Sequence, residues 1–285
     1  MLGIKSYESV KSISFILIII GIIVLLLAKN SHTLMRVMVG KEIDLKTAGF
    51  NETQTKHFRI RYLPVDEEYI DLVSNIAEDA YVSVSSVFGQ KPKDKTIIIV
   101  YPDNQSLAKS FGWDKDEKAM GVYWAGSIRI LSPRVWLSGS NIEEQFLKEG
   151  PVHHEFAHLM VDEITKGNYN RWWTEGIAQY VEKKITGFEF ADPYKYRKEI
   201  EYYSLDVLEK RFDSLDQQIA YWESLKAVEF IVNKYGEENI LSILNNMGDG
   251  YNLAQALSKT LNISYTTFEQ DFYHELQKDS KRCMD

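Results

Sequence analysis

Residues 154–158 of the chain read His-Glu-Phe-Ala-His, and residues 173–176 read Trp-Thr-Glu-Gly. Two histidines four positions apart on an α-helix differ by about 40° around its axis, so both imidazoles project from one face. Two ring nitrogens on one face can bind a single metal ion. Glu155 lies about 100° further round the helix. It is therefore placed to flank the metal and to act as a general base on a water molecule there.

A catalytic zinc site uses three protein ligands and leaves a further position for water. His154 and His158 therefore need a third partner, and Glu175 is the candidate, 17 positions after His158. Residues 167–170 (Gly-Asn-Tyr-Asn) predict a turn, and Thr174 is typical of the N-cap of a new helix. A helix, a turn and a second helix fold back antiparallel, which would bring Glu175 against the histidines.

The second stretch has a wider pattern around it. Residues 172–180 read Trp-Trp-Thr-Glu-Gly-Ile-Ala-Gln-Tyr. Together with the preceding His-Glu-Phe-Ala-His, this resembles the gluzincin metallopeptidases, and within them the peptidase MA-like domains, whose pattern is roughly HExxH and then WxxEGxAxY. The resemblance is strongest over residues 151–182 and extends more weakly from about 57 to 275.

The resemblance implies a zincin fold and zinc as the cofactor, with one ion per chain. In the family the two motif histidines and the later glutamate bind zinc, and the motif glutamate is the base. Residue by residue, this implies His154, His158 and Glu175 as ligands and Glu155 as the catalytic base. The implied reaction is hydrolysis of peptide bonds in peptide or protein substrates.

Two residues close to the motifs, Gln179 and His153, have predicted roles other than metal binding. Some gluzincins carry a carboxylate four residues after the glutamate ligand, where it holds a ligand histidine. Gln179 occupies that position here, on the same helix face as Glu175, so an amide is expected to take this orienting role. His153 lies about 140° off the ligand face, so we expect it to be a neighbour of the site and not a ligand.

Three other interpretations compete with an active peptidase. The HExxH pattern also arises by chance on amphipathic helices, but the setting of Glu175 favours a metal site. A membrane-tethered binding or scaffolding protein on an inactive peptidase fold is the main alternative. Such a protein would be expected to lack the catalytic base or a metal ligand, but Glu155 and Glu175 are both present. An intramembrane protease would need the motif inside an apolar span, which Asp162, Glu163 and Lys166 exclude.

The N-terminus carries an unbroken apolar run over residues 15–28. With residues 12–14 it spans 17 residues between Lys11 and Lys29. A bilayer-crossing helix takes roughly 17–25 residues, and flanking lysines can extend their side chains to the headgroups. The sequence therefore predicts a transmembrane anchor within residues 1–30. A cleaved signal peptide lacks a small-x-small cleavage site here, and a buried core helix does not fit all-round apolarity.

The orientation of this anchor is not decided by charge, because lysines or arginines lie on both sides of the run. Resemblance to surface-displayed members of the family implies a single-pass protein of the cell membrane. Its catalytic body would then lie outside the cytoplasm.

The composition argues against some classes of partner and of metal site. Of the 285 residues, 33 are Lys or Arg and 41 are Asp or Glu, giving a formal net charge of −8. An acidic chain without a basic cluster argues against nucleic acid as a partner. Cys283 is the single cysteine, so neither an intrachain disulfide nor a cysteine-built zinc site is possible.

Hydrophobic periodicity predicts an α+β fold with a small mixed sheet and helices in an N-terminal lobe, a pair of site helices, and an all-helical C-terminal lobe. Strands are expected at 58–63 and 95–101, with a hairpin or bent strand at 119–131. Helices are expected at 66–88, 106–111, 141–148, 151–166, 175–184, 192–212, 217–235, 237–247, 252–261 and 264–278. The expected domains are an anchor at 1–30, a stalk at 31–56, a zincin-like catalytic lobe at 57–190 and a helical lobe at 191–285.

Two further expectations concern substrate binding. In gluzincins an edge strand before the site helix binds the substrate backbone by strand addition. Residues 121–124 are either that edge or part of the sheet interior. The reaction also needs a second electrophile beside the metal, and among 17 tyrosines Tyr221 on the helical lobe is a candidate.

Overall fold

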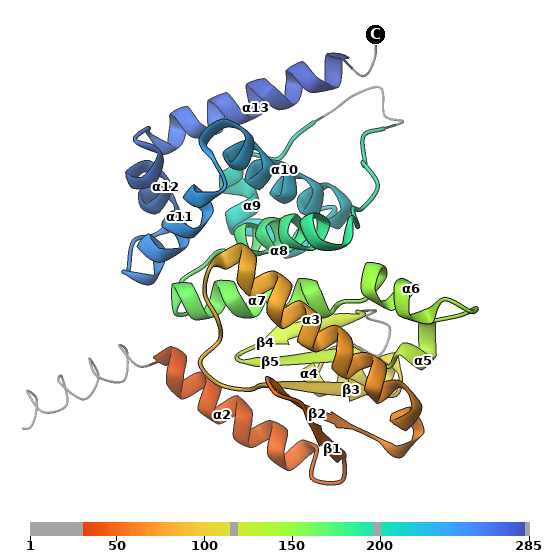
Figure 1. Ribbon diagram of the computed structural model, residues 1–285. Coiled ribbons are helices and arrows are strands. Elements are labelled where there is room, and N and C mark those ends of the chain that lie inside the picture. The colour runs from red at the N-terminus through yellow and green to blue at the C-terminus, as the bar shows by residue number, and fades with distance from the viewer. Residues whose placement is uncertain (1–30, 115–118, 196–200, 283–285) are drawn as a thin grey trace, which may run out of the picture. The chain divides into compact units, whose positions relative to one another are not determined.

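The computed structural model describes residues 31–114, 119–195 and 201–282 (Figure 1). The apolar run predicted as an anchor falls within residues 1–30, outside the described part. Among the described residues, no helix combines the length and apolarity needed to cross a membrane. The chain divides into two compact units, one ending at Ala48 and the other running from Gly49 to Asp285. The boundary expected near residue 190 stays a prediction.

The range expected to be a stalk contains regular structure. Helix α2 (Ser31–Lys46) belongs to the first unit, and the Thr47 hydroxyl donates to the Ile43 carbonyl at 2.7 Å as the helix ends. Strand β1 (Asn51–Gln54) belongs to the second unit and pairs antiparallel with β2 (Phe58–Tyr62). Residues 51–54 are therefore part of the sheet.

The sheet has five strands in the order β1-β2-β3-β5-β4. Strand β2 pairs parallel with β3 (Thr96–Tyr101), and β3 pairs parallel with β5 (Ser127–Leu131). Strand β4 (Gly121–Trp124) pairs antiparallel with β5 and takes the last place in the order. The prediction of a small mixed sheet is confirmed, and β4 is an edge strand.

The hairpin expected near Ala125-Gly126 is present. Both residues have positive φ, 43° and 92°, as in a type I′ turn, whose twist matches that of the flanking strands. The turn is held by the Gly126 N–H, which donates to the Tyr123 hydroxyl at 2.9 Å. The chain therefore reverses at this point and places β4 beside the helix that follows.

One face of the sheet carries the main core. A 3-10 turn (η1, Pro64–Tyr69) leads into α3 (Ile70–Phe88), whose apolar residues recur at helical spacing and are buried. Helix α3 ends at Gly89, where a φ of 61° favours glycine. The ring of Phe156, from helix α7 (Val152–Thr165), lies 5.7 Å from Phe58 of β2 and 5.9 Å from Tyr81 of α3. Aromatic packing thus fixes α7 against the sheet and α3.

The opposite face is covered by α4 (Asn104–Phe111). Arg129 lies between the core residues Ile128 and Ile130 of β5, so its side chain points to this second face. Its guanidinium lies 4.2 Å from the centre of the Phe111 ring and donates to the Ser110 carbonyl at 2.8 Å. A buried arginine is therefore paired with α4.

The remaining elements are helical. They are α5 (Pro133–Trp136), α6 (Ile142–Glu149), α8 (Arg171–Thr186), α9 (Leu205–Arg211), η2 (Phe212–Ser214), α10 (Gln217–Tyr235), α11 (Glu238–Gly248), α12 (Leu253–Leu261) and α13 (Tyr265–Arg282). Helix α7 lies between the sheet and α8, and α10 packs on α8 (Figure 1). A methyl group added at Gly176 of α8 would lie 2.3 Å from the Ser224 carbonyl of α10. A glycine is therefore required where these two helices meet.

The helix expected over residues 192–212 is confirmed only from Leu205 onward among the described residues. Residues 201–204 are not helical, and α9 begins only at Leu205. Asp192 accepts from the Tyr194 N–H at 2.7 Å in a turn. The backbone N–H of Tyr203 donates instead to the buried Glu223 carboxylate of α10, at 3.0 Å. Contacts with α10 outweigh the local helical signal here.

Candidate metal centre and catalytic site

The structure brings together the three residues expected to bind metal. His154 and His158 project from one face of α7, with their Nε2 atoms 3.1 Å apart. Oε2 of Glu175, on α8, lies 3.4 Å from both Nε2 atoms. One ligand atom from each of the three residues falls within 4.8 Å of the others.

The turn between α7 and α8 makes this meeting possible. Helix α7 ends at Lys166 with a φ of 56°, and Gly167 follows with a φ of 81°, so the chain leaves the helix as the sequence predicts. The Asn168 side chain donates to the carbonyls of Met247 at 2.7 Å and Tyr251 at 2.9 Å. These bonds hold the turn against the end of α11, so α8 starts in a fixed direction.

His154 is oriented by Glu182, which the sequence interpretation missed. Glu182 is buried on α8, and its Oε2 lies 3.1 Å from Nδ1 of His154. A carboxylate only accepts, so Nδ1 carries a proton, and Nε2 is the nitrogen left to bind a metal. Gln179, expected in this role, donates instead to the carbonyls of Glu175 at 3.2 Å and Tyr221 at 2.9 Å. The prediction for Gln179 is therefore wrong: its amide joins α8 to α10.

His158 is oriented by Thr174. The threonine hydroxyl lies 2.7 Å from Nδ1 of His158, and a proton on that nitrogen again leaves Nε2 with a free lone pair. Thr174 was expected to be the N-cap of its helix, but α8 begins three residues earlier, at Arg171. Its side chain is therefore inside the helix and turned toward α7.

The donor set fits a divalent cation. Oε2 of Glu175 is buried and has no hydrogen-bond partner, and the two Nε2 lone pairs face the same point. Burial alone lowers the pKa of His154, but Glu175 and Glu182 raise it well above its usual range. Burial raises the pKa of Glu175, but His158 and His154 lower it well below its usual range. The cluster therefore favours a positive charge at its centre, and two imidazoles with one carboxylate suit zinc.

Glu155 lies beside this cluster and touches the edge strand. Its Oε2 accepts from the Tyr123 N–H of β4 at 2.6 Å. A methyl group at Gly121 would lie 2.5 Å from Cβ of Pro151 and 2.9 Å from Cγ of Glu155, so only glycine lets the strand approach this closely. Burial raises the pKa of Glu155, although His154 and His158 oppose the shift. A carboxylate with a raised pKa is suited to accept a proton.

Arg171 contacts Glu175, and the charges of the site act on Tyr221. Nε of Arg171 lies 3.3 Å from Oε1 of Glu175. Burial raises the pKa of the Tyr221 hydroxyl well above its usual range, the charges of Glu175 and Glu155 raise it further, and Arg171 lowers it. Arg171 precedes Glu175 by four positions, a spacing that places both on one helix face and is visible in the sequence.

His153 is separate from the cluster, as expected. It is fully buried, and its Nε2 lies 3.1 Å from Oδ2 of Asp79 on α3.

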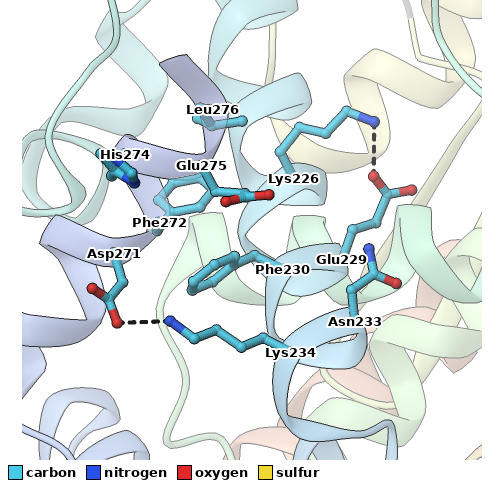
Figure 2. A pocket seen from close by; sticks show the side chains of 10 residues that line it. All are labelled: Lys226, Glu229, Phe230, Asn233, Lys234, Asp271, Phe272, His274, Glu275 and Leu276. Atoms are coloured by element: carbon cyan, nitrogen blue, oxygen red, sulfur yellow. Dashed lines mark hydrogen bonds and ion pairs between the residues drawn. The ribbon is translucent and has the colours of Figure 1, made fainter. Parts of the chain in front are cut away.

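A pocket of about 370 Å³ also lies apart, between α10 and α13 (Figure 2). Its lysines are paired, Lys226 with Glu229 and Lys234 with Asp271, each at 2.7 Å. None of the residues expected in the site lines this pocket.

Comparison with known proteins agrees with this geometry. The sequence model of the peptidase MA superfamily matches residues 76–277, which include both site helices and cover more than half of the chain. No curated protein matches the chain. The match confirms the resemblance carried by residues 154–158 and 172–180, and the chain belongs to the peptidase MA superfamily.

Proposed function

We propose that this protein is a zinc-dependent peptidase that hydrolyses peptide bonds in peptides or proteins. The observation that carries the proposal is the convergence of Nε2 of His154, Nε2 of His158 and Oε2 of Glu175 within 4.8 Å. These residues are the proposed ligands of one zinc ion, and Glu155 is the proposed base. Zinc held there would supply a Lewis acid that acidifies a water molecule and polarises the scissile carbonyl.

Glu155 would move the proton. It would accept a proton from the attacking water and later deliver it to the leaving amine. Its Oε2 is fixed by the Tyr123 N–H, and its raised pKa brings proton uptake and release closer to neutral pH. The edge strand and the base are thereby joined, which supports a role for β4 in aligning the substrate with Glu155.

Tyr221 would donate a hydrogen bond to the oxygen that becomes negative during attack. Its raised pKa keeps the hydroxyl protonated at neutral pH, as a donor must be. The Gln179 amide supports this placement because it donates to the Tyr221 carbonyl at 2.9 Å and so fixes α10 against α8.

The proposed substrate is a peptide segment in extended conformation. Strand β4 is the last in the sheet order and has β5 on one side only, among the described strands. An edge strand of this kind can take an added strand through its other main-chain groups, since the Tyr123 N–H is already bound by Glu155. Substrate recognition would then rest mainly on the peptide backbone.

The proposal also places the protein at a membrane. The lysine-flanked apolar run within residues 1–30 would be a single-pass anchor, with the catalytic body outside the cytoplasm. Extraction of cells at alkaline pH tests the anchor: the full chain should remain with the membranes, and a variant lacking residues 12–28 should not. Release of the full chain in that extraction would count against an anchor.

Hydrolysis of a mixture of peptides by the purified full chain tests the activity. We expect cleavage that a chelator abolishes, that zinc restores and that Glu155→Gln removes while zinc content is retained. The alternative is a binding or scaffolding protein on an inactive peptidase fold. Zinc binding with peptide association but no cleavage in any condition would support that alternative.

A further inference from the structure

Arg171 contacts both Glu175 and the short helix η2. It is the first residue of α8, and its side chain is about half exposed, at 52%. Its Nε lies 3.3 Å from Oε1 of Glu175, and its Nη1 lies 3.4 Å from Oδ1 of Asp213 in η2. Its guanidinium carbon lies 5.8 Å from the centre of the Phe212 ring. The guanidinium is therefore held on one side by η2 and faces Glu175 on the other.

The two oxygens of Glu175 have different surroundings. Oε1 faces the Arg171 guanidinium, whereas Oε2 is buried, has no hydrogen-bond partner and lies 3.4 Å from both histidine Nε2 atoms. A carboxylate can bind a metal ion through one oxygen or through both. We propose that Arg171 is a positioning residue that holds Oε1 of Glu175 so that only Oε2 is offered to the metal. This inference rests on the proposed zinc site.

Arginine suits this role better than lysine. Its guanidinium is planar, permanently charged and able to meet two carboxylates at once with separate N–H groups. Here Nε meets Glu175 and Nη1 meets Asp213, so the outer contact fixes the direction of the inner one. A single oxygen from Glu175 leaves more of the metal's coordination open to water and substrate, which hydrolysis requires.

A competing role for Arg171 is binding the free C-terminal carboxylate of a substrate. Its exposure would permit this, but its Nε is already engaged by the ligand itself. The two roles differ in what the metal senses when no substrate is present. If Arg171 is a positioning residue, replacing it changes the coordination of the metal in the substrate-free protein. If Arg171 only binds substrate, replacing it leaves that coordination unchanged.

Visible absorption of the full chain loaded with Co²⁺ in place of zinc tests the proposal. Absorption by Co²⁺ weakens when a fifth or sixth ligand joins a four-coordinate site. In Arg171→Met, Oε1 is released and can join Oε2, so we expect a loss of absorption intensity and a shift of the bands. Arg171→Lys, which keeps a charged donor, should restore most of the wild-type spectrum. Asp213→Asn, whose amide oxygen can still accept from the Arg171 guanidinium, should retain it.

Activity and folding measurements complete the test. We expect Arg171→Met to lower kcat by about 10–100-fold with little change in KM, as is typical for partners of metal ligands. Thermal unfolding of each variant shows whether the chain is folded. An unchanged Co²⁺ spectrum in folded Arg171→Met would overturn the proposal. If that variant also loses cleavage of free-acid peptides but not amidated ones, Arg171 binds substrate instead. A wild-type chain in which His154 and His158 bind no metal would overturn the zinc site itself.

Discussion

Oε2 of Glu182 lies 3.1 Å from Nδ1 of His154, and both side chains are largely shielded from solvent. The carboxylate fixes the tautomer and the direction of the imidazole, so that Nε2 faces His158 and Glu175. A glutamate two helical turns after Glu175 on α8 thus completes a site that α7 begins.

Glu182→Ala should lower zinc affinity by about 10–100-fold, because His154 would lose the acceptor that fixes its ring. Competition with a chromogenic chelator measures this affinity. The amide oxygen of Glu182→Gln still accepts but carries no charge. The zinc affinity of this variant should therefore lie between those of wild type and Glu182→Ala. Glu143→Ala on the exposed surface of α6 provides the control. Equal affinities for wild type and Glu182→Ala would show that Glu182 does not orient the ligand.

Thr174→Val should lower zinc affinity by about tenfold, because valine keeps the shape of threonine but removes the hydroxyl 2.7 Å from Nδ1 of His158. Thr174→Ser restores the hydroxyl and should recover the affinity. The same chelator competition measures both. If serine and valine behave alike, the hydroxyl is not what matters at this position.

Gly176→Ala should destabilise the protein by about 1–3 kcal/mol, because the new methyl group would overlap the Ser224 carbonyl and separate α8 from α10. Urea unfolding gives the change. Gly40→Ala is the matched control, since Gly40 is also in a helix and a methyl group there meets nothing within 4 Å. It should be neutral or stabilising, because alanine favours a helix more than glycine. A Gly176→Ala protein as stable as wild type would mean that the helices can separate freely.

Glu223 should make stability depend on pH. It is fully buried, and burial raises its pKa from 4.5 to about 8. The folded state therefore holds a proton that the unfolded state releases, so this contribution is complete below pH 4.5 and is lost as pH rises through about 8. Urea midpoints measured from pH 5 to pH 9 should fall less in Glu223→Gln than in wild type. Parallel declines in both proteins would contradict this account.

Local sequence features predict most of the α7–α8 helix pair and most of the sheet. Apolar spacing and Gly167 define α7, β-branched residues define β3, and Ala125-Gly126 marks the hairpin. Glu182 was not predicted because the resemblance points to position 179, four residues after the ligand, whereas Glu182 lies one helical turn further on. Thr174 was misassigned because threonine favours N-caps, but Asn170, which local capping preferences also favour, takes the N-cap position before Arg171.

The segment before α9 shows the same limit. Asp192-Pro193 has the form of a helix start, yet Tyr194 packs on Trp222 at 5.3 Å between ring centres, and the Tyr203 N–H donates to Glu223. Distant aromatic and polar contacts decide this conformation. The resemblance to a family supplied the proposed ligand set, whereas the residues that orient those ligands emerged only from the packing of α7 against α8.

Zinc content tests the central claim most directly. The purified full chain and Glu175→Ala are each offered zinc, dialysed and analysed by atomic absorption, with circular dichroism to verify folding. The account predicts about one zinc ion per chain in the wild type and a sharp loss in the variant. A correctly folded wild-type chain that retains no zinc would contradict the account, and the convergence of His154, His158 and Glu175 would then be a structural feature without a metal.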